Sequence, residues 1–314
     1  MLAYAFRRLS HALPVLLVVS LITFALIHLV PGDAAQVIAG PDATRAQVAD
    51  VRAALGLDQP LTTQLALWYW RALHGNFGDS FMLGRPVLQA IGERVPVTVL
   101  LSLYSLAITL PVGVIAGIVA ATQHNRWLDS TVMAVALLGV SVPGFWLSIM
   151  GMLLFSVDLG WLPATGYVPA SESLFQCLRS LTLPAVSLAV FQIGYLARMT
   201  RATTLEVLRQ DFIRTARAEG VAEWKILAKH ALKNVATPVL TAIGIIVAVA
   251  LAGAVVIEQI FALPGLGRLV VEGILRRDYP VIQGSLLVVA GTLVLINLAV
   301  DLLYAALDPR VRYE

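Results

Sequence analysis

The sequence offers few residues whose types and spacing suit catalysis or metal binding. No GxxxxGK(S/T) phosphate loop, HExxH motif or CxxC motif occurs in it. The single cysteine, Cys177, has no partner for a disulfide within the chain. The five histidines are scattered over different segments and show no metal-ligand spacing: His11, His28, His74, His124 and His230. We therefore expect no catalytic residue, no metal site and no ATP hydrolysis by the chain itself.

One serine suggests an alternative, an intramembrane serine protease. Ser141 lies in the apolar stretch "GVSV" that begins at Gly139. Such a protease needs a histidine at comparable depth in another helix to take the serine proton. His11 and His28 lie at the two ends of the first apolar run and do not meet that requirement. Next to Pro143, a serine also commonly satisfies backbone groups freed at a helix kink. The protease remains the less favoured alternative.

The elements that position these residues belong to a membrane protein. Hydrophobic residues make up 59% and charged residues 13% of 314 positions, and the mean hydropathy is +0.83. A soluble domain is about half apolar and about one quarter charged. The net charge of +3 is modest and gives no reason to expect a nucleic-acid partner.

A bilayer core requires roughly 20 apolar residues per helix. Six runs of suitable length predict an all-α integral membrane protein with six transmembrane helices. The runs are Leu9 to Val30, Val97 to Ala121, Ser130 to Val157, Leu181 to Ala197, Val235 to Ile257 and Val281 to Leu303. Only the last contains a formal charge, Asp301, and Gly113 with Gly117 forms a GxxxG pair that favours close helix approach.

The distribution of cations predicts the orientation. With a cytoplasmic N-terminus, thirteen of the 22 Lys and Arg residues fall on the inside, eight of them between Arg198 and Lys233. Five of the remaining cations lie in the long segment 31–96, which the positive-inside rule discounts. We therefore expect both termini of a multi-pass membrane protein to lie in the cytoplasm.

Segment 31–96 is polar enough to leave the membrane and predicts a helical elaboration outside it. Val48, Val51 and Leu55 have helical spacing and are followed by Gly56, while a second apolar pattern runs from Leu61 to Ala72 after Pro60. The expected organisation is 1–30 for the N-terminal end and first helix, 31–96 for this elaboration, and 97–314 for a core with a cytoplasmic loop at 198–234.

Two features outside the cytoplasm are candidate gate or solute-path residues. The stretch "HGNFGDSF" contains closely spaced glycines and predicts a specific turn, in which Phe77, Gly78 and Asp79 are the candidates. Glu258 lies near the end of the fifth apolar run, where a carboxylate can reach water or a cation. A structural role is the main alternative for each.

The cytoplasmic loop reads as a basic helical hairpin. Leu205, Leu208, Phe212 and Ala216 recur at helical spacing up to Gly220, after which Lys225, Lys229 and Lys233 follow at every fourth position. This pattern predicts two short helices joined at Gly220. Anionic lipid headgroups account for the charge, but the small residues Ala216, Ala218 and Gly220 favour docking into a protein groove.

These segments resemble the inner-membrane permease subunits of dipeptide, oligopeptide, glutathione and nickel ABC importers. The similarity extends over nearly all of the chain in family order. It is carried by "LVPGDAAQ", "LGLDQPL", "HGNFGDSF", "GWLPATGY", "DFIRTARAEGVAEW", "KHALKNVATP", "EQIFALPGLGRL", "RRDYPVIQG" and "DLLYAALDPRVRY". The resemblance implies a type I ABC importer permease fold and half of a translocation pore.

The resemblance also implies partners and cofactors. These are a second, non-identical permease, two cytoplasmic ATPase subunits that bind ATP and Mg, a periplasmic solute-binding protein and membrane lipid, with no cofactor on this chain. The hairpin would carry the coupling motif that enters a groove on the ATPase. The implied coupling residues are Asp211, Arg214, Thr215, Ala216, Arg217, Ala218, Glu219 and Gly220.

The general coupling pattern has Glu, Ala and Ala at positions 214 to 216. This sequence has Arg214, Thr215 and Ala216 there, a departure that the peptide-type subfamily shares. The motifs do not separate peptide, glutathione and nickel as solutes. The run Val37 to Pro41 and the C-terminal "VRYE" favour the peptide and glutathione branch, so nickel is kept as an alternative.

Overall fold

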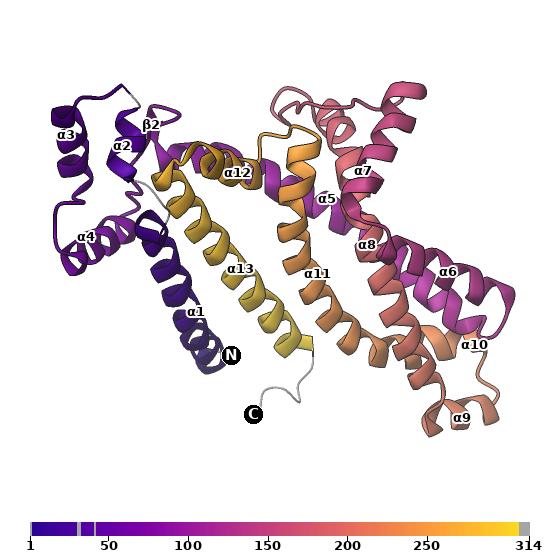
Figure 1. Ribbon diagram of the computed structural model, residues 1–314. Helices are drawn as coiled ribbons and strands as arrows, with labels where there is room; N and C mark the ends of the chain where they lie inside the picture. The colour runs from indigo at the N-terminus through magenta and orange to yellow at the C-terminus, as the bar shows by residue number, and fades with distance from the viewer. Residues whose placement is uncertain (1, 30–32, 41, 308–314) are drawn as a thin grey trace. The chain divides into compact units, whose positions relative to one another are not determined.

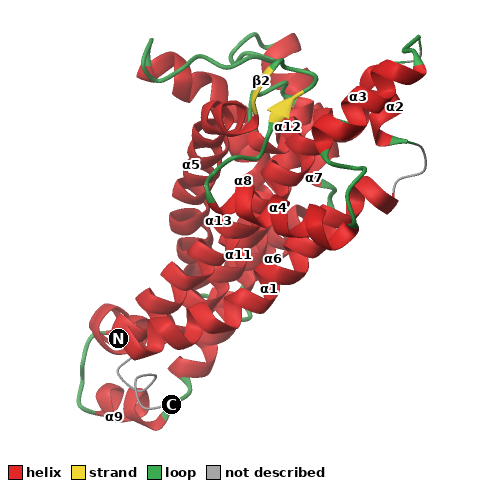
Figure 2. Cartoon of the chain, turned by 90° about the vertical axis from the view of Figure 1, so that its left-hand side faces the viewer, coloured by secondary structure: helices red, strands yellow, loops and turns green. Residues whose placement is uncertain are grey.

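The computed structural model describes residues 2–29, 33–40 and 42–307, and these are predominantly helical (Figures 1 and 2). The prediction of an all-α protein is confirmed. The elements of the first part are α1 (Leu2–Leu29), α2 (Ala34–Ala39), α3 (Arg45–Leu55), α4 (Leu61–Leu73), β1 (Asp79–Ser80), β2 (Arg85–Pro86), α5 (Val87–Thr122), α6 (Trp127–Ser141), α7 (Gly144–Met152) and the π-helix η1 (Leu153–Asp158). They are followed by α8 (Leu174–Leu208), α9 (Asp211–Ala218), α10 (Glu223–Lys225), the π-helix η2 (Ile226–Ala231), α11 (Leu232–Ile260), α12 (Leu266–Arg276) and α13 (Tyr279–Leu307).

Five of the six predicted apolar runs each overlap one helix, and the third extends over α6, α7 and η1. The helices differ in length. Four helical stretches are long and apolar enough to cross a membrane, namely α5, α8, the continuous run Glu223–Ile260, and Tyr279–Val300 of α13. The pair formed by α6 and α7 with η1 gives a fifth if it is counted as one span. The apolar part of α1, Leu13–Leu29, is shorter than these.

The third predicted run is broken rather than continuous. Its two halves are bent by 98° relative to each other at Val142 and Pro143. Val142 is extended, with φ −81° and ψ 128°, because the residue before a proline is disfavoured in the helical region. Pro143 then precedes α7, which begins at Gly144. The kink expected at this proline is confirmed, and it interrupts the helix.

By contacts the described chain divides into two units, of which the first is built mainly from Val97–Leu263. α8 is the central helix of this unit, since it packs against α6, α7 and α11. The largest apolar core of the unit combines α5, α8 and α11 with the segment that follows α11. It includes Leu101, Leu181, Leu183, Ala254, Ile257, Phe261 and Leu263.

Close contact between α5 and α8 depends on small residues. A Cβ atom added at Gly113 would lie 2.9 Å from the Cβ of Leu196, and one at Gly117 would lie 2.6 Å from the carbonyl oxygen of Ala197. Such distances leave no room for a side chain. The expectation that this GxxxG pair permits close helix approach is therefore confirmed.

The second unit comprises Phe6–Pro96 and Pro264–Leu295, so the predicted outer segment shares a unit with α12 and the start of α13. Both helices predicted in this segment are present. α3 ends at Gly56, which is left-handed with φ 71°, and α4 begins after Pro60. Pattern analysis did not predict the short helix α2, whose N-cap Asp33 accepts a hydrogen bond from the backbone of Ala35.

A glutamine holds three helices of this unit together. The Nε1 atom of Trp68 on α4 donates to Oε1 of Gln283 on α13 at 3.0 Å. Nε2 of Gln283 in turn donates to the backbone carbonyl of Thr23 on α1 at 3.1 Å. The hydroxyls of Ser20 and Tyr69 add a second link between α1 and α4, with a distance of 2.7 Å.

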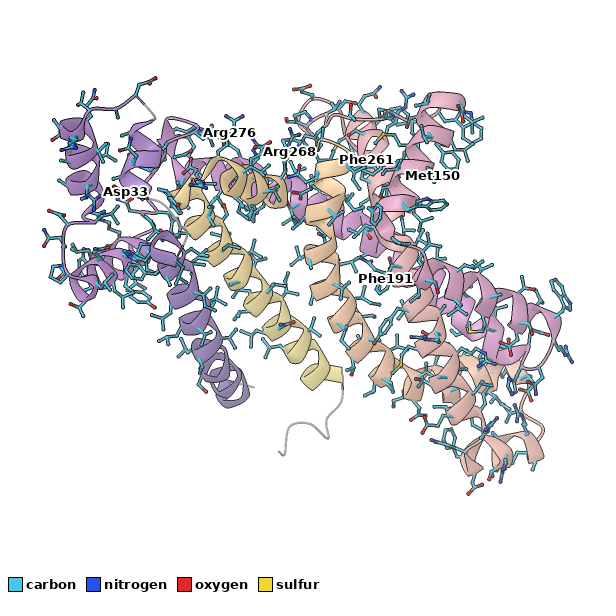
Figure 3. All side chains as sticks on the ribbon, viewed as in Figure 1. Asp33, Met150, Phe191, Phe261, Arg268 and Arg276 are labelled. Atoms are coloured by element: carbon cyan, nitrogen blue, oxygen red, sulfur yellow. The ribbon has the colours of Figure 1, made fainter. Side chains whose placement is uncertain are left out.

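α12 is an amphipathic helix of the same unit. Leu269 is fully buried on one side of it, whereas Arg268 and Arg276 project from the helix as Figure 3 shows. Arg268 Nε donates to Oε1 of Glu272 at 2.8 Å. The helix ends at Arg277, which is left-handed with φ 55°.

Candidate functional site

The candidate coupling hairpin follows α8 and bends at Gly220. α9 forms its first arm and ends at Glu219, after which Gly220 has φ +77°. The predicted join at Gly220 is confirmed. The prediction of a second separate short helix is wrong, because α10 continues through η2 into α11 as one helical run, Glu223–Ile260.

The interior of the hairpin is a small apolar cluster. Ile213 of α9 and Ile226 of η2 are fully buried against each other, with Ala216 at 6% exposure. Phe212, which the sequence pattern placed on the apolar stripe, is instead 40% exposed. The sequence pattern missed Ile213 because it extended the apolar stripe of α8 into α9 as if the two were one helix. The turn at Arg209 and Gln210 separates them, so helical spacing does not continue from one to the other.

The predicted coupling residues divide by exposure. Ala216 is the only one of the eight that is buried, and it packs inside the hairpin rather than at its surface. The exposed ones are Asp211, Arg214, Thr215, Arg217, Ala218, Glu219 and Gly220. The hairpin thus presents a polar, small-residue surface around its bend.

Charged side chains pair along this surface. Arg217 Nε donates to Oε1 of Glu223 at 2.7 Å and its Nη2 donates to Oε2 at 3.2 Å. The neighbouring carboxylate raises the pKa of Arg217 above its usual range. A second, more exposed pair joins Arg214 Nη1 to Asp211 Oδ1 at 3.2 Å. Both arginines belong to α9, so the first arm of the hairpin carries positive charge that these two carboxylates partly neutralise.

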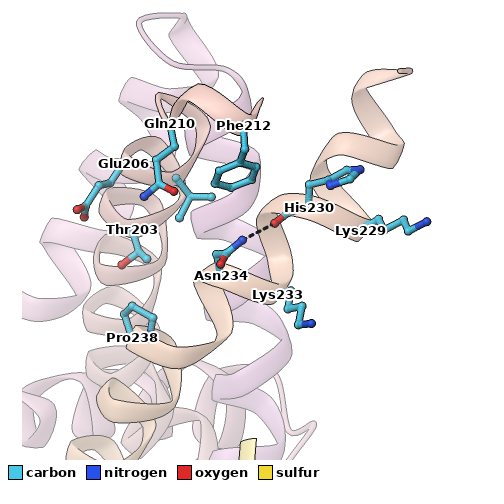
Figure 4. A pocket seen from close by; sticks show the side chains of 10 residues that line it. Thr203, Glu206, Gln210, Phe212, Lys229, His230, Lys233, Asn234 and Pro238 are labelled. Carbon is cyan, nitrogen blue, oxygen red and sulfur yellow. Dashed lines mark hydrogen bonds between the residues drawn. The ribbon is translucent and has the colours of Figure 1, made fainter. Parts of the chain in front are cut away.

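A cleft of about 720 Å³ lies beside the hairpin, between the end of α8 and the start of α11. Figure 4 shows Gln210 and Phe212 on one side and Asn234 on the other, while Lys229 and Lys233 extend away from the other side chains. Asn234 Nδ2 donates to the carbonyl of His230 at 2.8 Å. The direction of the two lysines fits the expected contact with lipid headgroups.

The segment 74–86, which contains the turn predicted outside the cytoplasm and is called the outer turn below, is built around a buried aspartate that sequence analysis did not select. Asp278, 2% exposed, accepts hydrogen bonds from Ser80 Oγ at 2.7 Å and from the backbone of Met82 at 2.9 Å. Its other oxygen accepts from the backbone of Val281 at 3.4 Å, at the start of α13. An aspartate directly before an apolar run is the N-cap signal that identifies it.

Of the candidate gate residues, three lie together and one does not. Phe77, Gly78 and Asp79 line one pocket of the second unit, and Gly78 has φ +82°. Glu258 belongs to the first unit, is fully buried and accepts a hydrogen bond from Thr98 Oγ1 at 2.5 Å. This burial fits the structural role that was the main alternative for Glu258, and its place in a gate or solute path stays a prediction.

Several sequence features lie outside the described residues. These are Pro41, which ends the run Val37 to Pro41, the side chain of Asp301, and the C-terminal "VRYE". Among the residues that the structure describes, no group of three His, Cys, Asp or Glu side chains is arranged to hold a metal ion.

Comparison with known proteins assigns both parts of the chain. Residues 113–313 match the family described as "Binding-protein-dependent transport system inner membrane component". Residues 1–102 match the corresponding N-terminal family. A solved structure of the MetNI methionine ABC transporter in an inward-facing conformation covers 71% of this chain and 96% of its own, with 22% identity and a TM-score of 0.56. That likeness shows the fold, which is the predicted type I ABC importer permease fold.

Curated relatives match the chain from end to end. A putative peptide transport system permease protein of Brucella abortus (strain 2308) is 54% identical over 314 residues, covering 100% of both chains. The dipeptide transport system permease protein DppB of Alkalihalophilus pseudofirmus is 41% identical and the glutathione transport system permease protein GsiC of Salmonella choleraesuis is 43% identical, each again over 100% of both chains.

Membership of this family makes the chain a transport component of a multi-pass inner-membrane complex, with ATPase and binding-protein partners. Its apolar helices agree with that setting. The chain belongs to the family of inner-membrane permease components of binding-protein-dependent ABC transport systems.

Proposed function

We propose that this chain forms half of the translocation pore of an importer that takes up small peptides, including glutathione-like ones. The observation that carries the proposal is full-length similarity to permeases named for peptide, dipeptide and glutathione transport. A second, non-identical permease forms the other half. The chain itself has no catalytic role, binds no cofactor and leaves ATP and Mg to two cytoplasmic ATPase subunits.

Coupling to ATP hydrolysis runs through the hairpin. The bend at Gly220 is exposed, and a Cβ atom added there would meet no described residue other than its chain neighbours within 4 Å. Space at that position is therefore not needed for the chain's own packing, which supports a close approach by a partner. α10, η2 and α11 form one helical run, so a force on the bend is transmitted directly into a membrane span.

The orientation follows from the same assignment. The hairpin must face the cytoplasm to meet an ATPase, and the outer segment must face the periplasm to meet a solute-binding protein. Both termini then lie in the cytoplasm. This agrees with the excess of Lys and Arg between Arg198 and Lys233.

The alternatives receive less support. Nickel is not among the solutes in the names of the relatives described above, which specify peptide, dipeptide and glutathione. An intramembrane protease is not favoured, because the whole chain aligns with transport permeases.

Uptake measurements test the proposal. Cells that lack this chain should fail to accumulate radiolabelled Ala-Phe-Ala, and the restored gene should recover accumulation while nickel-63 uptake stays unchanged. Loss of nickel uptake with normal peptide uptake would contradict it. Purified chain without partners should hydrolyse no ATP and conduct no solute in liposomes.

A further inference from the structure

The second unit contains a pocket that none of the preceding assignments explains. Its volume is about 440 Å³, within the range of roughly 300–1,000 Å³ that small-ligand sites have. Every lining residue belongs to this unit, and the walls come from α1, α3, α4, the outer turn and the start of α13. The residues that bear on its chemistry are Phe24, Trp68, Arg71, Phe77, Asp79 and Tyr279.

The aromatic wall of the pocket is fixed before any ligand arrives. Trp68 is held by its hydrogen bond to Gln283, whose amide is itself anchored on the carbonyl of Thr23. The ring of Phe24 packs on that of Trp68 with a centroid distance of 5.9 Å and a tilt of 57°. A fixed wall loses little conformational entropy on binding, which favours affinity.

Two opposite charges lie in the same pocket without internal partners. Among the residues that the structure describes, the guanidinium of Arg71 and the carboxylate of Asp79 take part in no ion pair or side-chain hydrogen bond. Both line the pocket. Some charged residues of this unit pair, as Arg52 does with Asp33, but exposed ones such as Arg45 and Asp50 of α3 also take part in no ion pair with a described residue. What distinguishes Arg71 and Asp79 is that these two exposed, opposite charges line one pocket.

Both charges are carried by well-positioned backbone. Asp79 stands between Gly78, whose nitrogen donates to Asn76 Oδ1 at 2.9 Å, and Ser80, whose hydroxyl is held by the buried Asp278. Arg71 follows Trp68 by three positions and so lies on the same face of α4. One cation and one carboxylate are thus presented from separate, anchored elements.

We propose that this pocket binds a short peptide by both of its ends. Asp79 accepts hydrogen bonds from the α-ammonium group, Arg71 donates to the α-carboxylate, and an apolar side chain lies against the aromatic wall. The proposal rests on the function proposed above and adds a permease-borne recognition site for the free termini. An anionic lipid headgroup fits less well, because Asp79 repels it.

Peptides with blocked ends test this assignment. The full-length chain, purified with its permease and ATPase subunits in nanodiscs and without binding protein, is mixed with radiolabelled Ala-Phe-Ala, its N-acetyl form or its C-terminal amide. We expect the free peptide to bind about tenfold more tightly than either blocked form, the equivalent of one charge-assisted pair. Equal binding of all three peptides would overturn the proposal.

Two variants assign each end of the peptide. Asp79→Asn should remove the discrimination against the N-acetyl form only, and Arg71→Gln the discrimination against the amide only. Asp50→Asn and Arg45→Gln, which change exposed residues of α3 outside the pocket, should retain both. A selectivity pattern of this kind does not arise from unfolding, which lowers the binding of every peptide alike.

Two further outcomes contradict the proposal in distinguishable ways. A copurified phospholipid that is detected by mass spectrometry and lost in Arg71→Gln would show that the pocket is a lipid site. If cells accumulate Ala-Phe-Ala through this chain while the purified complex shows no discrimination, the pocket assignment fails and the proposed function stands. If the chain supports no peptide uptake in cells, the proposed function itself fails.

Discussion

Arg217 and Glu223 close the bend of the hairpin from its two sides. They are six positions apart, and two hydrogen bonds of 2.7 and 3.2 Å join them past Gly220. The pair is partly exposed, so it adds only about 0.2–1 kcal/mol to stability. Its effect is to fix the shape of the bend rather than to hold the fold together.

Exchange of these two charges tests that role. Arg217→Glu should leave the amount of protein in the membrane unchanged and lower solute uptake, because two carboxylates then face each other across the bend. The double variant Arg217→Glu with Glu223→Arg should recover most of the uptake. No recovery in the double variant would mean that Arg217 contacts the ATPase itself.

Gly220 should be sensitive to a β-branched side chain. Its φ of +77° lies in the left-handed region, which valine strongly disfavours. Because no described residue other than its chain neighbours lies within 4 Å of an added Cβ atom, Gly220→Val should not disturb packing in the described part of the chain. We expect normal membrane abundance, about tenfold weaker recovery of the ATPase subunits, corresponding to about 1.4 kcal/mol, and strongly reduced uptake.

Substitutions that separate backbone strain from charge provide the controls. Asparagine adopts the left-handed conformation more readily than valine does, so more ATPase subunit should copurify with Gly220→Asn than with Gly220→Val. Lys225→Gln and Lys229→Gln should have mild effects, since these exposed cations suit lipid headgroups. Normal uptake with Gly220→Val, or severe loss with a lysine variant, would identify the hairpin as a lipid anchor instead.

Asp278 should be required for the outer turn. Its carboxylate accepts from both Ser80 and Met82 while it is 2% exposed. Asp278→Asn places an amide nitrogen or a weaker acceptor against those donors, at a cost of about 1–3 kcal/mol. We expect faster proteolysis within 74–86 of the purified complex. Ser80→Ala removes one donor to Asp278 and the acceptor of the Leu83 backbone N–H, at 2.9 Å, but leaves Met82 bonded to Asp278. It should have a smaller effect, and equal effects would contradict this account.

Local pattern in the sequence predicted the helices well, because each signal acts within a few residues. Gly56 and Pro60 delimit α3 and α4 as expected, and Pro143 interrupts the third apolar run. The 98° angle of that bend was not predicted, because a proline indicates a break in a helix without determining the angle between its two halves. The π-helix η2 likewise has no signal in the order of its residues.

The candidate sites were predicted less completely, because they depend on contacts between distant positions. Ser80 and Asp278 are 198 residues apart, and Trp68 and Gln283 are 215 apart. No periodicity relates such pairs. The motif "HGNFGDSF" did identify the turn, whereas the charge of Arg71 became informative only when the fold placed it in the same pocket as Asp79.

Thiol labelling tests the proposed orientation. In a Cys177→Ser background, a cysteine at Asp42 should react with a membrane-impermeant reagent in intact cells, and one at Lys225 should react only after the cells are broken. Cys177 is 2% exposed, so its own labelling should be slight, and the substitution removes what remains of that background. The reverse labelling pattern would contradict both the orientation and the coupling role.

Two glycines of α5 offer a matched test of helix packing. A Cβ atom at Gly117 would lie 2.6 Å from both the carbonyl oxygen of Ala197 and the Cβ of Thr200, whereas one at Gly92 would meet nothing within 4 Å. Neither of the atoms near Gly117 can rotate away, because one belongs to the backbone and the other is attached directly to it. Gly117→Ala must therefore push α5 and α8 apart, and overpacking of this kind costs about 1–3 kcal/mol.

Gly92→Ala changes the same residue type on the same helix without that contact. Alanine is about 0.8–1 kcal/mol more favourable than glycine in a helix interior, so this variant should be neutral or stabilising. We expect Gly117→Ala to lower the thermal unfolding midpoint of the detergent-solubilised complex by several degrees and to reduce membrane abundance, while Gly92→Ala does neither. Equal midpoints for the two variants would show that α5 and α8 are not held at the close distance the structure gives them.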